Sequence, residues 1–422
     1  MIRPFRHIIL AGTLFCFTHL YAQHIPVNEG ELARKYPFIG TVFNRVFNAT
    51  GLDSFFYKLS SLKNSDSGVV TIVHIGDSHI QPDFLSGVVR KGLQLSFGDA
   101  GRGLVFPYQL AQSNAPDDII SSSNSRWLFN RVAHPEINDN YGVSGYGIAT
   151  GNSGASINLS LRSTVALGEQ TFDRLKFFLE KGSATSWILQ AENNNEPFLL
   201  HKENDSLPYQ EVVLENPGSG FSLSSIPSTA TKAFFGVSLE RSNPGILYHA
   251  IGVNGARYDQ YNIATGFWEQ LPALKADLYI ISLGTNEAQR AIFNQQFFYQ
   301  ELSLFIRKLK ESSPGASVLI TTAPDSYKGR TSNKVLKQLN QSLTDYCNEN
   351  YIPLWDLYRI TNGYGSAYSW ARRGLMSRDR IHFTAEGYRL QGGLLFNALA
   401  KAYNSYIDTY QNNPAAKAQD GQ

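Results

Sequence analysis

The sequence predicts an α/β protein in which a parallel sheet lies between two layers of helices and carries an inserted all-β module. Before residue 115 and after residue 243, apolar strand-like runs alternate with segments of helical spacing. This alternation predicts a doubly wound sheet, here a flavodoxin-like three-layer sandwich. Between these parts, short strand-like runs are separated by turn residues. About 400 residues also exceed what one hydrophobic core usually serves, so we expect two domains.

The first 22 residues are typical of a secretory signal peptide. Arg3 and Arg6 precede an apolar stretch at 8–17, and Ala22 precedes the expected cleavage point. That stretch is too short to span a bilayer, and no other run approaches about 18 apolar residues. We therefore expect a periplasmic or secreted protein without membrane insertion. Cys16 lies inside the apolar stretch, which argues against a lipoprotein.

Charge and cysteine content argue against nucleic-acid binding, an intrachain disulfide and a cysteine-based metal site. The chain has 37 Lys and Arg against 35 Asp and Glu, and loss of Arg3 and Arg6 leaves 35 of each. A near-neutral chain without a basic stripe is not expected to bind nucleic acid. Removal of Cys16 leaves Cys347 without a disulfide partner and excludes a cysteine-based metal cluster. The 22 Tyr, 26 Phe and 5 Trp could pack on sugars, but they more often fill cores.

The first strand is predicted at 69–75, and a serine follows it closely. Six of its seven residues are β-branched, and the run ends at Gly76, Asp77 and Ser78. Helical spacing begins after Pro82. Ligands bind at the carboxyl edge of parallel sheets, where a helix N-terminus favours developing negative charge. Ser78 is therefore a candidate nucleophile; alternatively, Asp77 or Ser78 only caps the helix.

The β-module is predicted at about 115–243, after a loop at 98–103. Its strand-like runs cover residues 155–161, 175–180, 187–191, 211–214, 221–226 and 233–239. Short strands separated by Asn, Pro and Gly are typical of a β-sandwich. The domain plan is then a signal peptide at 1–22, an α/β domain at 23–114 and 244–411, the β-sandwich at 115–243, and a disordered polar tail at 412–422.

Strands and helices alternate again after the module. Strands are predicted within 247–256, 277–288, 317–322 and 352–357, and helices near 297–309, 333–350 and 384–406. The first two of these strands break at Asn254-Gly255 and at Gly284-Thr285-Asn286. Asp379 and His382 lie just before the last helix, where one turn can present both side chains to the same cleft.

Four short blocks in this order resemble those of the SGNH (GDSL-type) hydrolases. The blocks are Gly76-Asp77-Ser78, Gly255, Gly284-Thr285-Asn286 and Asp379-x-x-His382. The resemblance implies an acyl-enzyme mechanism, with Ser78 as nucleophile, His382 as base and Asp379 orienting the imidazole. It also implies an oxyanion hole made by the N–H groups of Ser78 and Gly255 and by the side chain of Asn286. Taken singly, Asp-x-x-His could cap a helix, and Asn286 could be a turn residue.

Within this group, the chain is similar to bacterial peptidoglycan O-acetylesterases. The extended first block GDSHIQPD at 76–83, the inserted β-module and the signal peptide carry this similarity. Those enzymes have a carbohydrate-binding-like insert and deacetylate the 6-hydroxyl of muramic acid, although no motif inside the insert of this chain can be matched. The similarity implies an exported serine esterase that acts on an acetylated glycan, with peptidoglycan as the leading candidate. The alternatives are a polysaccharide O-acetyltransferase and a non-catalytic glycan-binding protein.

We assign no catalytic role to the two histidines on either side of Asp77. His74 lies in the first strand and is expected to be a hydrogen-bonded core residue, and His79 receives no role. Their spacing with Asp77 fits no zinc motif, so we expect neither a metal nor another cofactor. Because the four blocks lie outside 115–243, we expect the module to be dispensable for chemistry on a small ester yet to matter for a polymer. It could bind glycan, bind calcium or only shape the cleft. Three residues shortly before Asp379 either contact the substrate or belong to a solvated basic loop. They are Trp370, Arg372 and Arg373.

Overall fold

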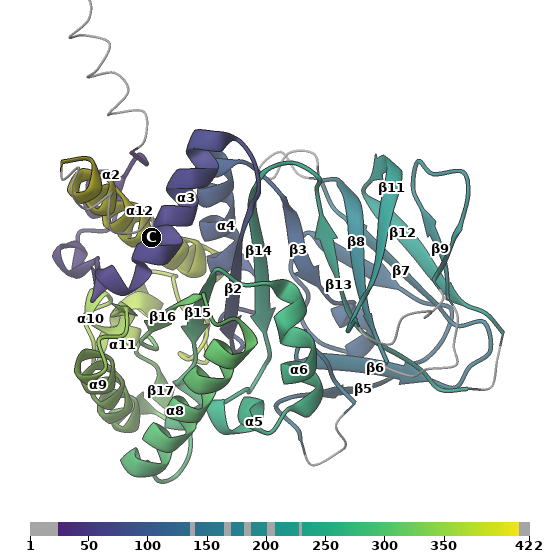
Figure 1. Cartoon of the computed structure of the whole chain (residues 1–422). Coiled ribbons are helices and arrows are strands. Elements are labelled where there is room, and N and C mark those ends of the chain that lie inside the picture. The colour runs from purple at the N-terminus through teal and green to yellow at the C-terminus, as the bar shows by residue number, and fades with distance from the viewer. Residues whose placement is uncertain are drawn as a thin grey trace, which may run out of the picture.

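The computed structural model describes residues 24–135, 140–163, 170–180, 187–200, 207–227 and 230–412. The expected signal peptide lies outside this part of the chain, as does nearly all of the expected tail. The described chain forms an α/β body and a β-domain side by side (Figure 1). No helix within the described ranges has the length and apolar character needed to cross a bilayer.

A six-stranded sheet forms the centre of the α/β body, in the order β1-β19-β16-β15-β2-β14. The strands are β1 (Val46–Phe47), β2 (Val69–Gly76), β14 (Gly245–Gly252), β15 (Leu278–Ser282), β16 (Ser317–Thr321) and β19 (Leu354–Trp355). All neighbours pair in parallel except β1, which joins β19 antiparallel. The predicted parallel sheet is therefore confirmed, with one additional edge strand that the sequence analysis did not anticipate.

Helices cover both faces of this sheet (Figure 1). One face carries α2 (Glu29–Lys35), α3 (Asp53–Ser65), α4 (Phe84–Phe97) and α12 (Ala385–Asn412); the other carries α5 (Tyr258–Asn262), α6 (Thr265–Gln270), α8 (Gln295–Ser312) and α9 (Lys334–Glu349). Three further helices are α7 (Thr285–Ala288), α10 (Leu357–Ile360) and α11 (Ser366–Arg372). Side chains alternate across a strand, so Val70 and Ile72 of β2 pack with one helix layer while Val73 and Ile75 pack with the other.

Two antiparallel sheets pack against each other in the β-domain. Their orders are β10-β9-β12-β7-β4 and β11-β8-β13-β6-β5, with β3 also paired to β13. The strands are β3 (Gly101–Val105), β4 (Ile119–Ser122), β5 (Leu128–Arg131), β6 (Tyr146–Thr150), β7 (Ser156–Leu161), β8 (Phe172–Leu179), β9 (Trp187–Ala191), β10 (Phe198–Leu200), β11 (Gln210–Gly218), β12 (Gly220–Ser225) and β13 (Lys232–Glu240). The rings of Phe177 and Phe221 meet between the sheets, 5.4 Å apart. The two sheets fit the predicted β-sandwich insert.

The first strand of the β-domain sheets precedes the expected boundary at residue 115. β3 pairs with β13 and also lies beside β14, where the N–H of Leu104 donates to Nδ1 of His249 at 2.9 Å. The glycines of the predicted loop allow this approach. Gly103 has a φ of 80°, and a Cβ there would lie 2.2 Å from the carbonyl oxygen of Tyr248. Part of the segment predicted as a loop, 98–103, is therefore a strand that connects the two bodies.

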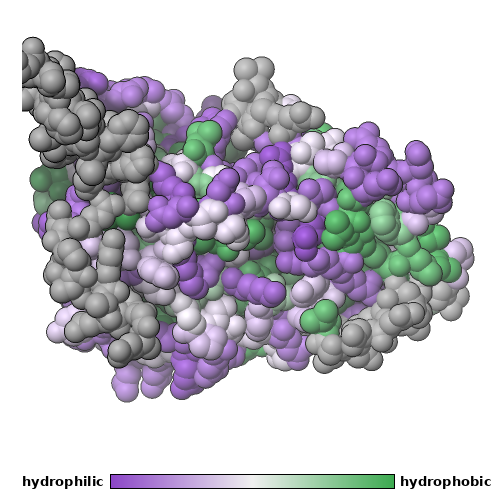
Figure 2. Space-filling view, turned by 45° about the horizontal axis from the view of Figure 1, so that its top comes forward, coloured by the Kyte–Doolittle hydropathy of each residue, from purple (hydrophilic) through white to green (hydrophobic). Residues whose placement is uncertain are grey.

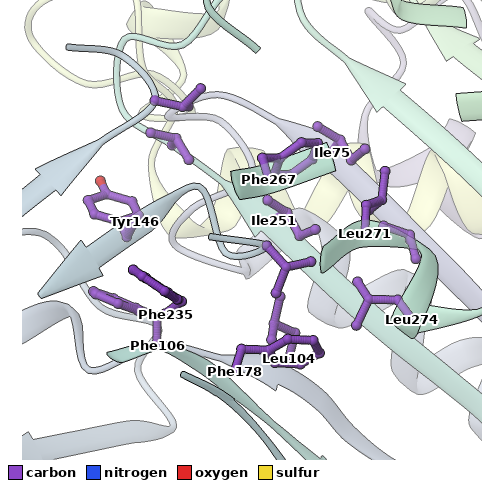
Figure 3. Close-up of a cluster of buried hydrophobic side chains, with 14 of the residues drawn as sticks. Ile75, Leu104, Phe106, Tyr146, Phe178, Phe235, Ile251, Phe267, Leu271 and Leu274 are labelled. Carbon is purple, nitrogen blue, oxygen red and sulfur yellow. The ribbon is translucent and has the colours of Figure 1, made fainter. Parts of the chain in front are cut away.

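The two bodies share one hydrophobic core (Figure 3). It contains Ile75, Leu104, Phe106, Tyr146, Phe178, Phe235, Ile251, Phe267, Leu271 and Leu274. These residues come from β2, β14, α6 and the 3₁₀ turn Leu271–Leu274 of the α/β body, and from several strands of the β-domain and the residue after β3. A segment that contributes to a common core cannot be removed without exposing apolar surface. The dispensability of the module for chemistry on a small ester stays an untested expectation, and the shared core favours the opposite one, that its removal destabilises the whole chain.

The visible surface is mostly hydrophilic, with a hydrophobic patch toward the β-domain end at the right (Figure 2). Most large aromatic residues lie inside instead: the largest fully buried side chains are all Trp, Tyr or Phe. Cys347 is buried and forms no disulfide. The abundance of aromatic residues is thus explained mainly by core packing.

Candidate active site

Ser78 lies in a tight turn at the carboxyl end of β2. The backbone N–H groups of Ile80 and Gln81 donate to the carbonyl of Asp77, at 3.1 and 3.2 Å. The carboxylate of Asp77 also accepts the N–H of His79 at 2.9 Å. α4 begins only at Phe84, with Asp83 at its N-cap. Asp77 and Ser78 therefore shape this turn and do not cap the helix.

Ser78, His382 and Asp379 form a hydrogen-bonded chain. Oγ of Ser78 lies 2.9 Å from Nε2 of His382, and Nδ1 of His382 lies 2.7 Å from Oδ2 of Asp379. Partial burial alone would raise the pKa of Asp379, but hydrogen bonds from His382 and Ile381 outweigh it and lower that pKa. An ionised Asp379 can hold the imidazole in the orientation that leaves Nε2 free to take the serine proton.

The expected oxyanion donors differ in their availability. Gly255 has a φ of 85°, a left-handed conformation that favours glycine. Within the described ranges, the N–H groups of Ser78 and Gly255 donate to no other protein group, so both can donate to a bound oxygen. The side chain of Asn286 is already engaged: Nδ2 donates to Oδ2 of Asp77 at 3.2 Å and to the carbonyl of Ala256 at 3.1 Å. An oxyanion bond from Asn286 would have to replace one of these.

Two buried carboxyl groups lie close to this region. Burial raises the pKa of Asp77 to about 7, and it raises the pKa of Glu287 to about 7 as well. Oε1 of Glu287 accepts the backbone N–H of Tyr258 at 2.8 Å, while Oε2 has no partner. The sequence analysis did not single out Glu287, whose only signal was its position directly after Asn286.

Gln81 joins the nucleophile turn to the β-domain and to the loop of Gly255. Its side chain is buried, and Oε1 accepts two hydrogen bonds at 2.9 Å, from the N–H of Asn254 and the hydroxyl of Tyr146. Nε2 donates to Oγ of Ser113 at 2.9 Å and to the carbonyl of Asn114 at 2.8 Å. The bond from Asn254 ties the turn of Ser78 to the loop of Gly255, and the bond from Tyr146 ties it to the β-domain. Sequence reasoning missed Gln81, since all four partners are distant in the chain.

His79 packs against the expected catalytic base. The rings of His79 and His382 are 5.5 Å apart at an interplanar angle of 35°, and Nδ1 of His79 lies 3.0 Å from the hydroxyl of Tyr388. Burial lowers the pKa of His79 to about 3, so the ring stays neutral at physiological pH. A neutral ring can support His382 without opposing the positive charge that develops there.

Two other residues noted in the sequence lie in the core. The ring nitrogens of His74 lie 2.7 Å from the hydroxyls of Tyr248 and Ser282, as expected for a hydrogen-bonded core residue. Trp370 is buried and packs edge-on against Phe383, at 5.4 Å. The described ranges contain no group of three or more His, Cys, Asp or Glu that could hold a metal ion.

Comparisons with known proteins identify the same region. Residues 219–390 match the family model of the GDSL-like lipases/acylhydrolases. This segment includes Gly255, Asn286, Asp379 and His382 but not Ser78. The solved structure of a peptidoglycan O-acetylesterase has 23% sequence identity and a TM-score of 0.69, and the match covers 83% of this chain and 96% of that chain. No curated protein matched the sequence.

Two further solved structures match less extensively. A lipase/acylhydrolase from Enterococcus faecalis has 20% identity and a TM-score of 0.31, over 37% of this chain and 77% of that chain. A family two carbohydrate esterase from Cellvibrio japonicus has 12% identity and a TM-score of 0.30, over 68% of this chain and 100% of that chain.

Proposed function

We propose that this chain, a carboxylic ester hydrolase with a domain of the GDSL-like lipase/acylhydrolase family and the SGNH hydrolase fold, is an exported serine O-acetylesterase. Its proposed substrate is an acetylated polysaccharide, with peptidoglycan as the first candidate. The hydrogen-bonded chain from Ser78 through His382 to Asp379 carries this proposal.

The geometry supports an acyl-enzyme mechanism. His382 takes the proton from Ser78 as Oγ attacks the acetyl carbonyl, and Asp379 stabilises the resulting imidazolium. The carbonyl oxygen gains negative charge and accepts hydrogen bonds from the N–H groups of Ser78 and Gly255. Collapse of this intermediate releases the sugar hydroxyl, which receives the proton from His382. Water then hydrolyses the acetyl-enzyme by the same route, and acetate leaves.

The exposure of the triad supports a polymeric substrate. The side chains of His382 and Asp379 are 40% and 45% exposed, so they do not lie in an enclosed pocket. A glycan strand can therefore approach without being threaded into the protein. The similarity over most of the chain to a peptidoglycan O-acetylesterase supports peptidoglycan as the first substrate to test, as does the signal peptide predicted from the sequence.

Acetate release tests the proposal directly. Purified protein is incubated with O-acetylated peptidoglycan, acetylated xylan and p-nitrophenyl acetate, and Ser78→Ala is the matched control. We expect acetate from p-nitrophenyl acetate and from peptidoglycan, and none above background from the variant. An acetyltransferase would give an acetylated sugar acceptor in place of free acetate. A purely glycan-binding protein would give neither product, and either outcome would refute the proposed esterase activity.

A further inference from the structure

We infer that the loop carrying Asp379 and His382 also recognises a carboxylate of the substrate, and that Arg380 is the recognising residue. The inference rests on the proposed esterase function and adds a substrate class to it. That class is an acidic acetylated glycan, in which a carboxylate lies near the ester.

The backbone of Arg380 is fixed within the catalytic loop. The residue lies between Asp379 and His382 and has a φ of 55°. Its N–H donates to the carbonyl of Ser377 at 3.0 Å, and its carbonyl accepts the N–H of Tyr327 at 2.8 Å. A left-handed conformation is uncommon for a residue with a long side chain. Together with the two hydrogen bonds, it fixes the position of Arg380 in this loop.

Tyr327 connects this loop to the end of α7, the short helix that carries Asn286. Its carbonyl accepts a hydrogen bond of 3.0 Å from Nε2 of Gln289, which lies three residues after Asn286. Arg380 is therefore linked through Tyr327 to the segment that follows Asn286. Arg380 is also only two residues from His382, whose Nε2 lies 2.9 Å from Oγ of Ser78.

Two tyrosine rings hold the guanidinium of Arg380. The guanidinium carbon lies 4.7 Å from the ring centroid of Tyr327 and 5.8 Å from that of Tyr368. Tyr368 is 49% exposed, and Arg380 is partly exposed. Cation–π contacts engage the face of a guanidinium and leave its N–H groups available at the edge. That edge can donate two parallel hydrogen bonds to a carboxylate.

Positive charge gathers at the end of α11 and on the loop that follows it. The segment 372–380 contains four arginines and one acid, Asp379, and this acid is bound to His382. In the described part of the chain, no carboxylate forms an ion pair with any of these arginines: Arg372, Arg373, Arg378 and Arg380. By contrast, the buried Arg102 pairs with both Asp83 and Asp118. An uncompensated cationic rim raises the local concentration of an anionic substrate.

Two matched aryl acetates isolate the role of the carboxylate. The substrates are 4-acetoxybenzoate and 4-acetoxybenzamide, compared in the wild type and in Arg380→Gln. We expect kcat/KM for the carboxylate to fall by roughly tenfold, mainly through KM, because a charge-assisted hydrogen bond is lost. For the amide we expect a change of less than about twofold, since it carries no charge to pair. Each variant is compared with the wild type on the same substrate, so the different reactivities of the two esters cancel.

Two further variants serve as controls. Arg307→Gln removes an exposed arginine of α8, whose side chain is 68% exposed and lies 3.8 Å from Glu311. This variant should leave kcat/KM unchanged for both aryl acetates. Arg380→Lys should recover part of the activity on the carboxylate, because the charge remains but the forked geometry is lost. High salt should reduce the preference of the wild type for the carboxylate.

A binding assay makes the test independent of turnover. Ser78→Ala protein is run through native gels that contain polygalacturonate or dextran, and we expect retardation by polygalacturonate only. Adding Arg380→Gln should abolish the retardation. The inference is overturned if Arg380→Gln lowers activity equally on both aryl acetates, or if polygalacturonate causes no retardation. Failure of the proposed function looks different, because the wild type would then cleave neither aryl acetate while the retardation persisted.

Discussion

The hydroxyl of Tyr146, a residue of the β-domain, donates a hydrogen bond of 2.9 Å to the side-chain oxygen of Gln81, three residues after Ser78. The same oxygen accepts the N–H of Asn254, the residue before Gly255. The turn of Ser78, the loop of Gly255 and the β-domain thus meet at one buried side chain. The β-domain is in this way connected to the chemistry, although it supplies none of the triad residues.

Gln81→Leu should therefore impair both stability and catalysis. The substitution leaves several buried polar groups without partners, and we expect the free energy of unfolding to fall by roughly 3 kcal/mol or more. Among molecules that remain folded, kcat should fall while KM changes little, because the loop of Gly255 is no longer tied to the turn of Ser78. Tyr146→Phe removes one of the four bonds of Gln81 and the 3.1 Å contact with Ser113, and should cost about 1–2 kcal/mol. Urea unfolding and steady-state kinetics on p-nitrophenyl acetate measure both effects; unchanged kcat in Gln81→Leu would show that the contact has no positioning role.

The triad predicts a simple order of effects on p-nitrophenyl acetate hydrolysis. Ser78→Ala and His382→Ala should each lower kcat by several orders of magnitude, and Asp379→Ala should lower it less, since the three residues act as a unit. Turnover should require no added metal. Rates like those of the wild type from Ser78→Ala, or loss of activity on chelation in a protein that stays folded, would contradict the mechanism.

Asn286→Ala separates an oxyanion role from a structural one. If Asn286 gives up its bond to Asp77 or to Ala256 and donates to the oxyanion, its loss should lower kcat by about 10²–10³ with little change in KM. If those two bonds are its whole function, stability should fall while the rate per folded molecule holds. Kinetics corrected for the folded fraction, measured by circular dichroism, decide between the two roles.

Glu287→Gln should change how stability depends on pH. A carboxyl group whose pKa is raised in the folded state contributes stability that is present at low pH and is lost as the pH rises through the folded-state value, here about 7. Gln carries no charge and does not lose this contribution. Relative to the wild type, the variant should therefore gain up to roughly 3 kcal/mol in free energy of unfolding between pH 5 and pH 8. Urea unfolding at both pH values provides the measurement, and a constant difference would show that Glu287 does not titrate in this range.

Replacement of residues 115–243 by a Gly/Ser linker should abolish folding of the whole chain, because it removes one side of the shared core. A single substitution in the shared core tests the energetic coupling of the two domains without removing either of them. Phe106 is fully buried, and Phe106→Ala should lower the free energy of unfolding by about 3–5 kcal/mol. Loss of activity and loss of β-sheet circular dichroism should then occur at the same urea concentration. Separate transitions, or a linker variant that retains esterase activity, would show that the domains are energetically independent.

Much of the fold could be predicted from the sequence because its signals are local. The β-branched run before Ser78 and the apolar runs before Gly255 and Asn286 identify strands by composition and length. Parallel strands end at one edge, so residues that directly follow them were expected to come together. The close spacing of Asp379 and His382 likewise predicted that one turn presents both. The SGNH fold and the ester hydrolase class are confirmed, while the catalytic roles of individual residues remain predictions.

The tertiary structure decided what depends on contacts between distant segments. The partners of the Asn286 amide, the four bonds of Gln81 and the placement of Arg380 between two tyrosine rings all join residues that no local pattern relates. The strand β3 could not be predicted from the sequence for a similar reason. Its glycines suit a loop when they are viewed alone, and they form a strand only because β13 and β14 supply partners on either side. Hydrogen-bond partners and shared cores are set by packing, and packing between distant segments leaves no periodic signal in the sequence.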